Sequence, residues 1–141
     1  ATEPQTLKIQ TATAAVNKSA RRRILVVDDN VDAAESLVLL LNLSGNDART
    51  AFNGQEALDV AITFRPDAVF LDIGLPRMNG YEVARQLLAD PATASAKLIA
   101  LTGWGAENDI LKSKKAGFHA HHTKPIDPEA IDALLAKLLS A

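Results

Sequence analysis

The stretch AVFLDIGLP, residues 68–76, decides how the chain folds. Its leading apolar residues run directly into one carboxylate, Asp72, after which Gly74 and Pro76 interrupt the regular backbone. A short apolar run that ends in turn residues is typical of a buried strand in a parallel sheet. In open sheets of this kind, ligands bind just beyond the carboxyl ends of the strands. Asp72 is therefore either a turn or helix-capping residue or a reactive group.

Strand-like and helix-like patterns alternate on both sides of this stretch. Apolar or alternating runs predict five strands, and helical periodicity predicts five helices. This alternation is typical of an α/β domain made of βαβ units, in which helices cover both faces of a parallel sheet. The expected strands are 24–27, 47–52, 68–72, 97–101 and 118–123, and the expected helices are one between Asn30 and Gly45, then 55–64, 81–88, 107–116 and 128–138.

Single residues indicate where some elements begin and which side they bury. Asn30 is placed to cap the first helix, and Asp127 is placed to cap the last one. In the helix over 55–64, we expect Leu58, Ala61 and Ile62 to face the core. The strand over 47–52 is more polar than the others, so we expect it at an edge of the sheet.

The composition is that of one folded domain. The chain has 141 residues, 48% of them hydrophobic and 23% charged, which suffices for a single core. A net charge of −2 gives no large positive field for binding nucleic acid. The absence of cysteine excludes disulfides and thiolate chemistry. No apolar run approaches the roughly 18 residues of a membrane span, and no signal peptide is visible, so we expect a cytoplasmic location without membrane contact.

Four of the five expected strands end in polar residues, namely Asp28 and Asp29, Asp72, Thr102 and Lys124. Parallel strands of one sheet end on the same side, so the topology brings these residues to one edge. Each residue has a structural interpretation when taken alone, as a helix cap, a turn hydroxyl or a surface lysine. Their occurrence together at one edge indicates a functional site.

The residue types at this edge suit phosphoryl transfer. Three neighbouring carboxylates repel one another, and a small hard cation such as Mg²⁺ removes that conflict. Lys124 offers a positive charge and Thr102 a hydroxyl donor, and both suit phosphoryl oxygens. Asp72 can then act as a nucleophile toward phosphorus and become an aspartyl phosphate. The protein would contribute positioning and charge neutralisation.

Four motifs resemble those of a known family in their order and spacing: LVVDDN at 25–30, LDIGLPRMNG at 71–80, LTG at 101–103 and TKP at 123–125. From about Arg22 to Leu139 the chain resembles the receiver domain of two-component signalling, the response-regulator fold. The resemblance implies a single doubly wound (βα)5 domain with a flavodoxin-like, five-stranded parallel sheet of strand order 2-1-3-4-5. We expect residues 22–141 to form this domain and residues 1–21 to be a linker or N-terminal arm.

The resemblance also implies roles for the site residues. Asp72 would be the phosphoacceptor and would receive the phosphoryl group from a histidine on a kinase or a phosphotransfer protein. Asp29, Asp72 and the backbone carbonyl of Gly74 would bind Mg²⁺ directly, and Asp28 would act largely through water.

The resemblance further implies a conformational switch. Thr102 and Lys124 would hold the phosphoryl oxygens, and Thr102 would move together with an aromatic residue on the fifth strand. That aromatic position is His121 here, three residues before the lysine. His121 either packs like a small aromatic ring or makes the switch depend on pH. A metal site made of His119, His121 and His122 is a weaker alternative, because His122 points to the other side of the strand.

Two other functions remain as alternatives. A phosphatase of the haloacid dehalogenase type also uses an aspartate nucleophile and Mg²⁺, but it needs a second carboxylate two residues later, where Gly74 stands here. A pseudo-receiver would dock partners without being phosphorylated, and the presence of the acidic, hydroxyl and basic site residues counts against it. We expect a phosphoacceptor that promotes its own phosphorylation and dephosphorylation but is not an enzyme.

The wider protein can also be anticipated. The chain does not begin with Met, and no patterned output segment follows the last expected helix. We expect a stand-alone response regulator or a receiver from the C-terminal part of a longer protein, such as a hybrid histidine kinase.

Overall fold

The computed structural model describes residues 22–73, 80–102, 117–123 and 127–139. The described residues form five strands and four helices. The strands are β1 (Arg23–Val27), β2 (Asp47–Ala51), β3 (Ala68–Asp72), β4 (Lys97–Thr102) and β5 (Ala120–Thr123), and the helices are α2 (Val31–Leu43), α3 (Gly54–Phe64), α4 (Gly80–Ala89) and α6 (Pro128–Leu139). The helix expected over 107–116 lies outside the described residues.

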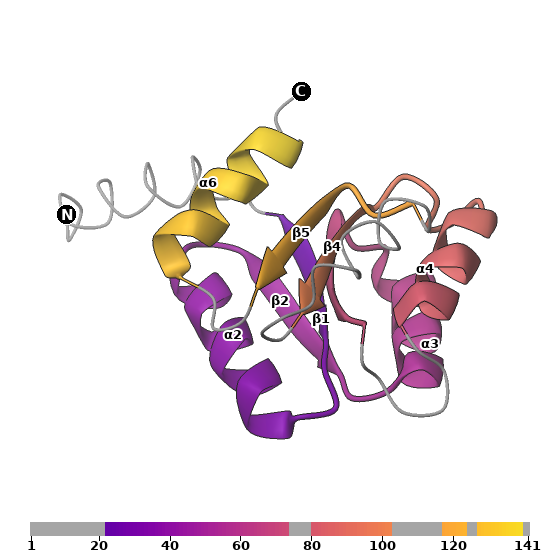
Figure 1. The fold of residues 1–141 in the computed structure, drawn as a ribbon, viewed down its shortest axis with the longest axis horizontal. Coiled ribbons are helices and arrows are strands. Elements are labelled where there is room, and N and C mark those ends of the chain that lie inside the picture. The colour runs from indigo at the N-terminus through magenta and orange to yellow at the C-terminus, as the bar shows by residue number, and fades with distance from the viewer. Residues whose placement is uncertain (1–21, 74–79, 103–116, 124–126, 140–141) are drawn as a thin grey trace, which may run out of the picture.

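The five strands form one parallel sheet in the order β2-β1-β3-β4-β5 (Figure 1). This arrangement confirms the doubly wound, flavodoxin-like order that the family resemblance implied. β2 lies at an edge, as its polar sequence predicted. The register pairs Val27 with Leu71 and Asp72 with Leu101, so neighbouring strands end at nearly the same level. Residues that follow the strands therefore gather along one edge of the sheet.

Helices cover both faces of the sheet (Figure 1). Because side chains alternate along a strand, Leu25 and Val69 pack with α3 and α4, whereas Val26 and Phe70 pack with α2 and α6. Burial on both sides explains why the central strands are continuous apolar runs. In the described part of the chain, no helix is long and apolar enough to cross a membrane.

Capping side chains lie at the N-termini of α2 and α6, at the residues that the sequence predicted. The Asn30 side chain accepts a hydrogen bond from the backbone N–H of Ala33 at 3.1 Å and caps α2. An Asp127 carboxylate oxygen accepts one from the N–H of Glu129 at 3.1 Å, at the start of α6. Asn53 caps α3 in the same way, since its side chain accepts a hydrogen bond from the N–H of Glu56 at 2.8 Å.

The prediction that Ile62 faces the core is wrong, since its side chain is 50% exposed. Helix α3 buries Ala61 as expected, together with Ala57 and Phe64 at helical spacing, and Leu58 is partly buried against the core. Ile62 is turned about 100° from Ala61 around the helix axis and therefore lies at the border of the buried stripe. β5 is also shorter than expected: it begins at Ala120, whereas the sequence predicted a strand over 118–123.

Candidate metal centre at the carboxyl edge of the sheet

Three carboxylates come together where β1 and β3 end. Asp28 and Asp29 follow β1, and Asp72 is the last residue of β3. These strands are neighbours in register, and one carboxylate oxygen from each residue lies within 4.8 Å of the others. Asp28 is buried, Asp72 is half-buried and Asp29 is exposed. The carboxylate cluster is thus open to solvent on the side of Asp29 and Asp72.

Asp28 also shapes the turn after β1. One of its carboxylate oxygens accepts a hydrogen bond from the Asn30 N–H at 3.0 Å, and its own N–H donates to the carbonyl of Ala51 at 3.1 Å. The helix itself is capped by Asn30. The structural interpretation of Asp28 as a cap of the first helix is therefore wrong, and its role in the turn coexists with its position in the carboxylate cluster.

The carboxylate cluster has the donor set of a hard cation. At 4.8 Å, two unit negative charges near a protein surface repel by about 3.5 kcal/mol with an effective dielectric constant of about 20. A divalent cation among the three carboxylates turns this repulsion into attraction. Oxygen ligands without histidine or cysteine match the preference of Mg²⁺. The three residues therefore fit the ion that the sequence predicted.

The other predicted site residues are described only in part. The backbone of Thr102 ends β4, the strand next to β3, and pairs in register with Thr123 of β5. Gly74 and Lys124 lie outside the described residues. The structure thus brings Asp28, Asp29 and Asp72 together and puts the Thr102 backbone at the same edge, as the parallel topology predicted.

The histidines lie along the edge strand. His121 is half-buried in β5 and pairs in register with Ala100. Its neighbour His119 precedes the strand and is exposed. Within the described ranges, the carboxylate cluster is the one group of three or more possible metal ligands. The alternative of a metal site made of the three histidines is therefore not borne out in this part of the chain.

Gly80 is a site residue whose role the sequence did not reveal. A Cβ atom on it would lie 2.6 Å from the Ile73 Cα and 2.8 Å from the Asp72 carbonyl oxygen. The Gly80 N–H donates to the carbonyl of Ile73 at 3.3 Å. Only glycine lets α4 begin this close to the end of β3. The position of Asn79-Gly80 just before the helical pattern is the sequence signal that could have indicated this role.

Comparison with known proteins identifies the family. The response regulator receiver domain matches residues 24–136. Protein PilH of Pseudomonas aeruginosa is 35% identical over 118 residues, which cover 81% of this chain and 98% of PilH. The DNA-binding response regulator MtrA of Mycobacterium tuberculosis is 36% identical over 113 residues, which cover 80% of this chain but only 48% of MtrA.

Solved structures agree with this match. A protein described as a response regulator from Chloroflexus aurantiacus has a TM-score of 0.81 and 29% identity, with 86% of this chain and 99% of that chain covered. The receiver domain of the sensor histidine kinase PA1611 from Pseudomonas aeruginosa has a TM-score of 0.78 and 25% identity, with the same coverage. That structure holds a magnesium ion in its active-site cleft. With its sheet order, its carboxylate cluster and these relatives, the chain belongs to the response regulator receiver domain family of two-component signalling, as a phosphoacceptor rather than an enzyme.

Proposed function

We propose that Asp72 accepts a phosphoryl group from a phosphohistidine on a partner protein. Membership of the receiver family implies a kinase as partner, and we take the donor to be a histidine kinase or a histidine phosphotransfer protein. The observation that carries the proposal is the carboxylate cluster, in which Asp72 is half-buried and lies next to Asp28 and Asp29 at the open edge of the sheet.

The transfer itself moves one phosphoryl group. A carboxylate oxygen of Asp72 forms the new O–P bond while the P–N bond of the donor breaks, and the electron pair of that bond returns to the imidazole. Bound Mg²⁺ would supply charge neutralisation and orientation for the phosphoryl oxygens. Asp72 is partly exposed, so a donor can reach it without unfolding the site.

Each remaining residue has a proposed part. Asp29 and the Gly74 carbonyl would bind Mg²⁺ directly with Asp72, and Asp28 would act through water. The likeness to the magnesium-bound receiver of PA1611 supports this set. Thr102 and Lys124 would hold the phosphoryl oxygens.

We propose that Thr102 and His121 form the switch. His121 lies on β5 beside β4, the strand that ends in Thr102, so a movement of Thr102 toward the phosphoryl group can change the packing of His121. The output would be a change in a protein-interaction face that includes β5 and α6.

We also propose that residues 22–141 form the receiver domain and that residues 1–21 are a linker before it. The domain would act in the cytoplasm and make no contact with nucleic acid. We further propose that the chain derives from a hybrid histidine kinase.

The test of the proposed function is the intact mass of the protein after incubation with acetyl phosphate and Mg²⁺. We expect one phosphoryl adduct, which should not form when a chelator is present and should be removed by hydroxylamine. Asp72→Asn is expected to abolish the adduct, because the amide is not a nucleophile toward phosphorus. Asp32→Asn, in the first turn of α2 and outside the carboxylate cluster, is the matched control and should keep it.

Two results would contradict the assignment. An adduct that survives in Asp72→Asn would mean that another residue is the acceptor. A folded protein that takes up no phosphoryl group from acetyl phosphate or from a phosphorylated donor would favour the phosphorylation-independent docking module.

A further inference from the structure

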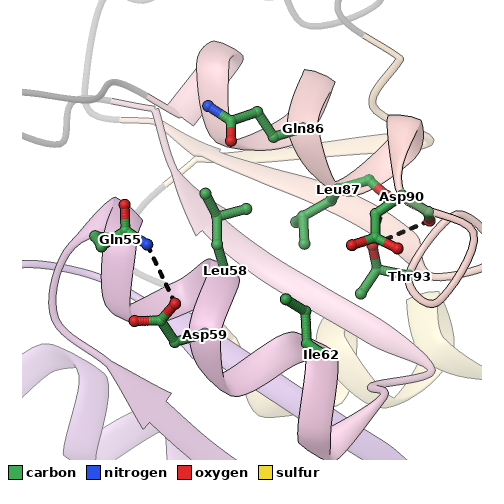
Figure 2. A pocket seen from close by; sticks show the side chains of 8 residues that line it. All are labelled: Gln55, Leu58, Asp59, Ile62, Gln86, Leu87, Asp90 and Thr93. Atoms are coloured by element: carbon green, nitrogen blue, oxygen red, sulfur yellow. Dashed lines mark hydrogen bonds between the residues drawn. The ribbon is translucent and has the colours of Figure 1, made fainter.

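Helices α3 and α4 pack side by side and leave a groove between them (Figure 2). The groove has a volume of ≈ 220 Å³. Four of its lining residues come from α3, and the others come from α4 and the turn that follows it. They are Gln55, Leu58, Asp59, Ile62, Gln86, Leu87, Asp90 and Thr93, and we call this set the α3–α4 groove.

The floor and one wall of the α3–α4 groove are aliphatic. Leu87 is buried, Leu58 is partly buried, and Ile62 is 50% exposed. Figure 2 shows these three side chains between the two helices. An aliphatic side chain that enters the groove would cover apolar surface on all three, and the removal of such surface from water is favourable.

Two of the polar residues of the α3–α4 groove carry negative charge. Asp59 and Asp90 are its charged residues, and each follows a glutamine by four positions on its own helix or just beyond it. Asp59 accepts a hydrogen bond from the Gln55 side chain at 3.1 Å, and Asp90 accepts one from the Ala92 N–H at 2.9 Å. Within the described ranges neither carboxylate forms an ion pair. The groove therefore attracts cations.

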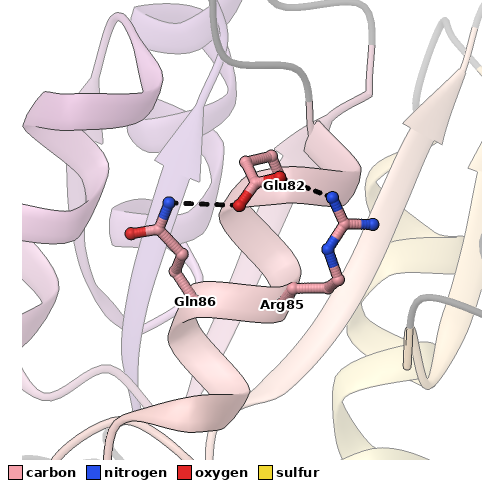
Figure 3. A network of polar contacts seen from close by, with 3 residues as sticks. All are labelled: Glu82, Arg85 and Gln86. Atoms are coloured by element: carbon pink, nitrogen blue, oxygen red, sulfur yellow. Dashed lines mark hydrogen bonds and ion pairs between the residues drawn. The ribbon is translucent and has the colours of Figure 1, made fainter.

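The arginine of α4 does not neutralise this charge. Arg85 pairs with Glu82, and the Gln86 side chain donates to the same carboxylate (Figure 3). These contacts lower the pKa of Glu82, and the hydrogen bond from Arg85 has the largest effect. Arg85 is thus engaged by Glu82, five residues before Asp90.

The size of the α3–α4 groove restricts its occupant. Sites for cofactors and drug-sized ligands usually have volumes of about 300–1,000 Å³, and ≈ 220 Å³ is below this range. The space suits one aliphatic side chain of a polypeptide, whose neighbouring residues would reach the carboxylates at the border.

We propose that the α3–α4 groove docks a short basic segment of a partner protein, with one leucine or isoleucine between Leu58, Ile62 and Leu87 and flanking lysine or arginine at Asp59 and Asp90. The groove lies toward the C-terminal end of α4, whereas the N-terminal end of α4 adjoins Asp72. Ten helical residues span about 15 Å. Docking at the groove and phosphorylation at Asp72 can therefore occur together.

The experiment selects random phage-displayed peptides on the full chain, with counter-selection on a variant that combines Ile62→Ser, Asp59→Asn and Asp90→Asn. Asn at position 90 keeps the oxygen that accepts the Ala92 N–H, and Ile62 is exposed, so this variant should fold. We expect enriched peptides with a leucine or isoleucine next to lysine or arginine. Synthetic copies should bind the variant about tenfold more weakly or worse, which is about 1.4 kcal/mol.

Matched controls test whether the peptides bind at the α3–α4 groove and whether this binding is independent of Asp72. Leu43→Ser and Asp132→Asn remove an exposed leucine and an exposed aspartate from α2 and α6, and both should keep full affinity. Asp72→Asn should also bind the peptides, which separates this proposal from the proposed function. Salt should weaken binding to the native chain more than binding to the variant.

Several outcomes would overturn the proposal. One is a selection that returns no common sequence, or peptides that bind the variant and the native chain equally well. Another is a chain whose self-association is abolished by Ile62→Ser, because the groove would then belong to a second copy. Enriched peptides without basic residues would also contradict it.

Discussion

His119 joins the edge strand β5 to β4 through both its backbone and its imidazole. Its N–H donates to the Leu98 carbonyl at 2.7 Å, and its Nδ1 accepts from the Leu98 N–H at 3.0 Å. An imidazole that accepts at Nδ1 must be neutral there. Desolvation by partial burial, and then the positive charge of Lys97, lower the pKa of His119 below 6.5.

This hydrogen bond predicts that acid weakens the fold. Between the lowered pKa of His119 and about 6.5, the unfolded chain binds more protons than the folded chain. The free energy of unfolding should therefore fall as the pH drops through this window, and the loss is complete below the folded pKa. Because His119 is exposed, we expect a loss within about 1 kcal/mol, the net value of one hydrogen bond.

Urea unfolding at several pH values measures this effect. In His119→Asn, the side-chain oxygen can accept the Leu98 N–H without titrating, so the drop across this window should shrink. His122→Asn on the same edge strand is the control and should keep the drop. An unchanged pH dependence in His119→Asn would show that another group is responsible.

At the level of elements, the junction of β3 and α4 positions Asp72. Gly80 lets the first turn of α4 pack against the backbone of Ile73 and Asp72. We expect Gly80→Ala to lower the free energy of unfolding by about 1–3 kcal/mol, the usual cost of overpacking. It should also slow phosphoryl uptake, because the backbone that carries Asp72, the proposed phosphoacceptor, must shift.

A second substitution in α4 separates these two effects. Ala89→Gly, at the exposed end of the helix, lowers stability by up to about 1 kcal/mol through helix propensity alone. It should leave phosphoryl uptake from acetyl phosphate unchanged. If Gly80→Ala takes up the phosphoryl group at the native rate, the close contact has no part in positioning Asp72.

At the level of the whole molecule, the proposed binding of Mg²⁺ at the carboxylate cluster would raise the stability of the fold. A cation that binds only the folded chain adds about 2.7 kcal/mol to the free energy of unfolding at one hundred times its dissociation constant. We therefore expect Mg²⁺ to raise the melting temperature and a chelator to reverse the rise. Without metal, Asp29→Asn should be more stable than the native chain, because it relieves repulsion with Asp28 and Asp72.

Thermal unfolding with and without Mg²⁺ checks this prediction. Asp29→Asn should lose the rise with Mg²⁺, and Asp32→Asn should retain it. A native chain whose melting temperature does not respond to Mg²⁺, while Asp29→Asn is less stable than the native chain, would contradict a cation site in the carboxylate cluster.

Much of the fold follows from local patterns in the sequence. The apolar runs at 24–27 and 68–71 are strands buried on both faces, and the caps Asn30 and Asp127 begin their helices as predicted. These features depend on neighbours within a few residues, and propensity and periodicity therefore report them. The polar residues at the strand ends could be predicted to share an edge, because parallel strands end on one side.

Features that join distant segments required the tertiary structure. The strand order followed from the family resemblance and not from periodicity. A helical pattern between two strands does not show which strand the second one pairs with. Register between β1 and β3 brings Asp28, Asp29 and Asp72 within 4.8 Å and leaves them unequally exposed. The outward position of Ile62 and the bond between His119 and Leu98 likewise depend on which element packs against which. The sequence by itself determined the strands and helices of the described ranges and the residue types at the edge of the sheet. Only tertiary packing decided their distances, their exposure and the groove between α3 and α4, because these arise between residues far apart in the chain.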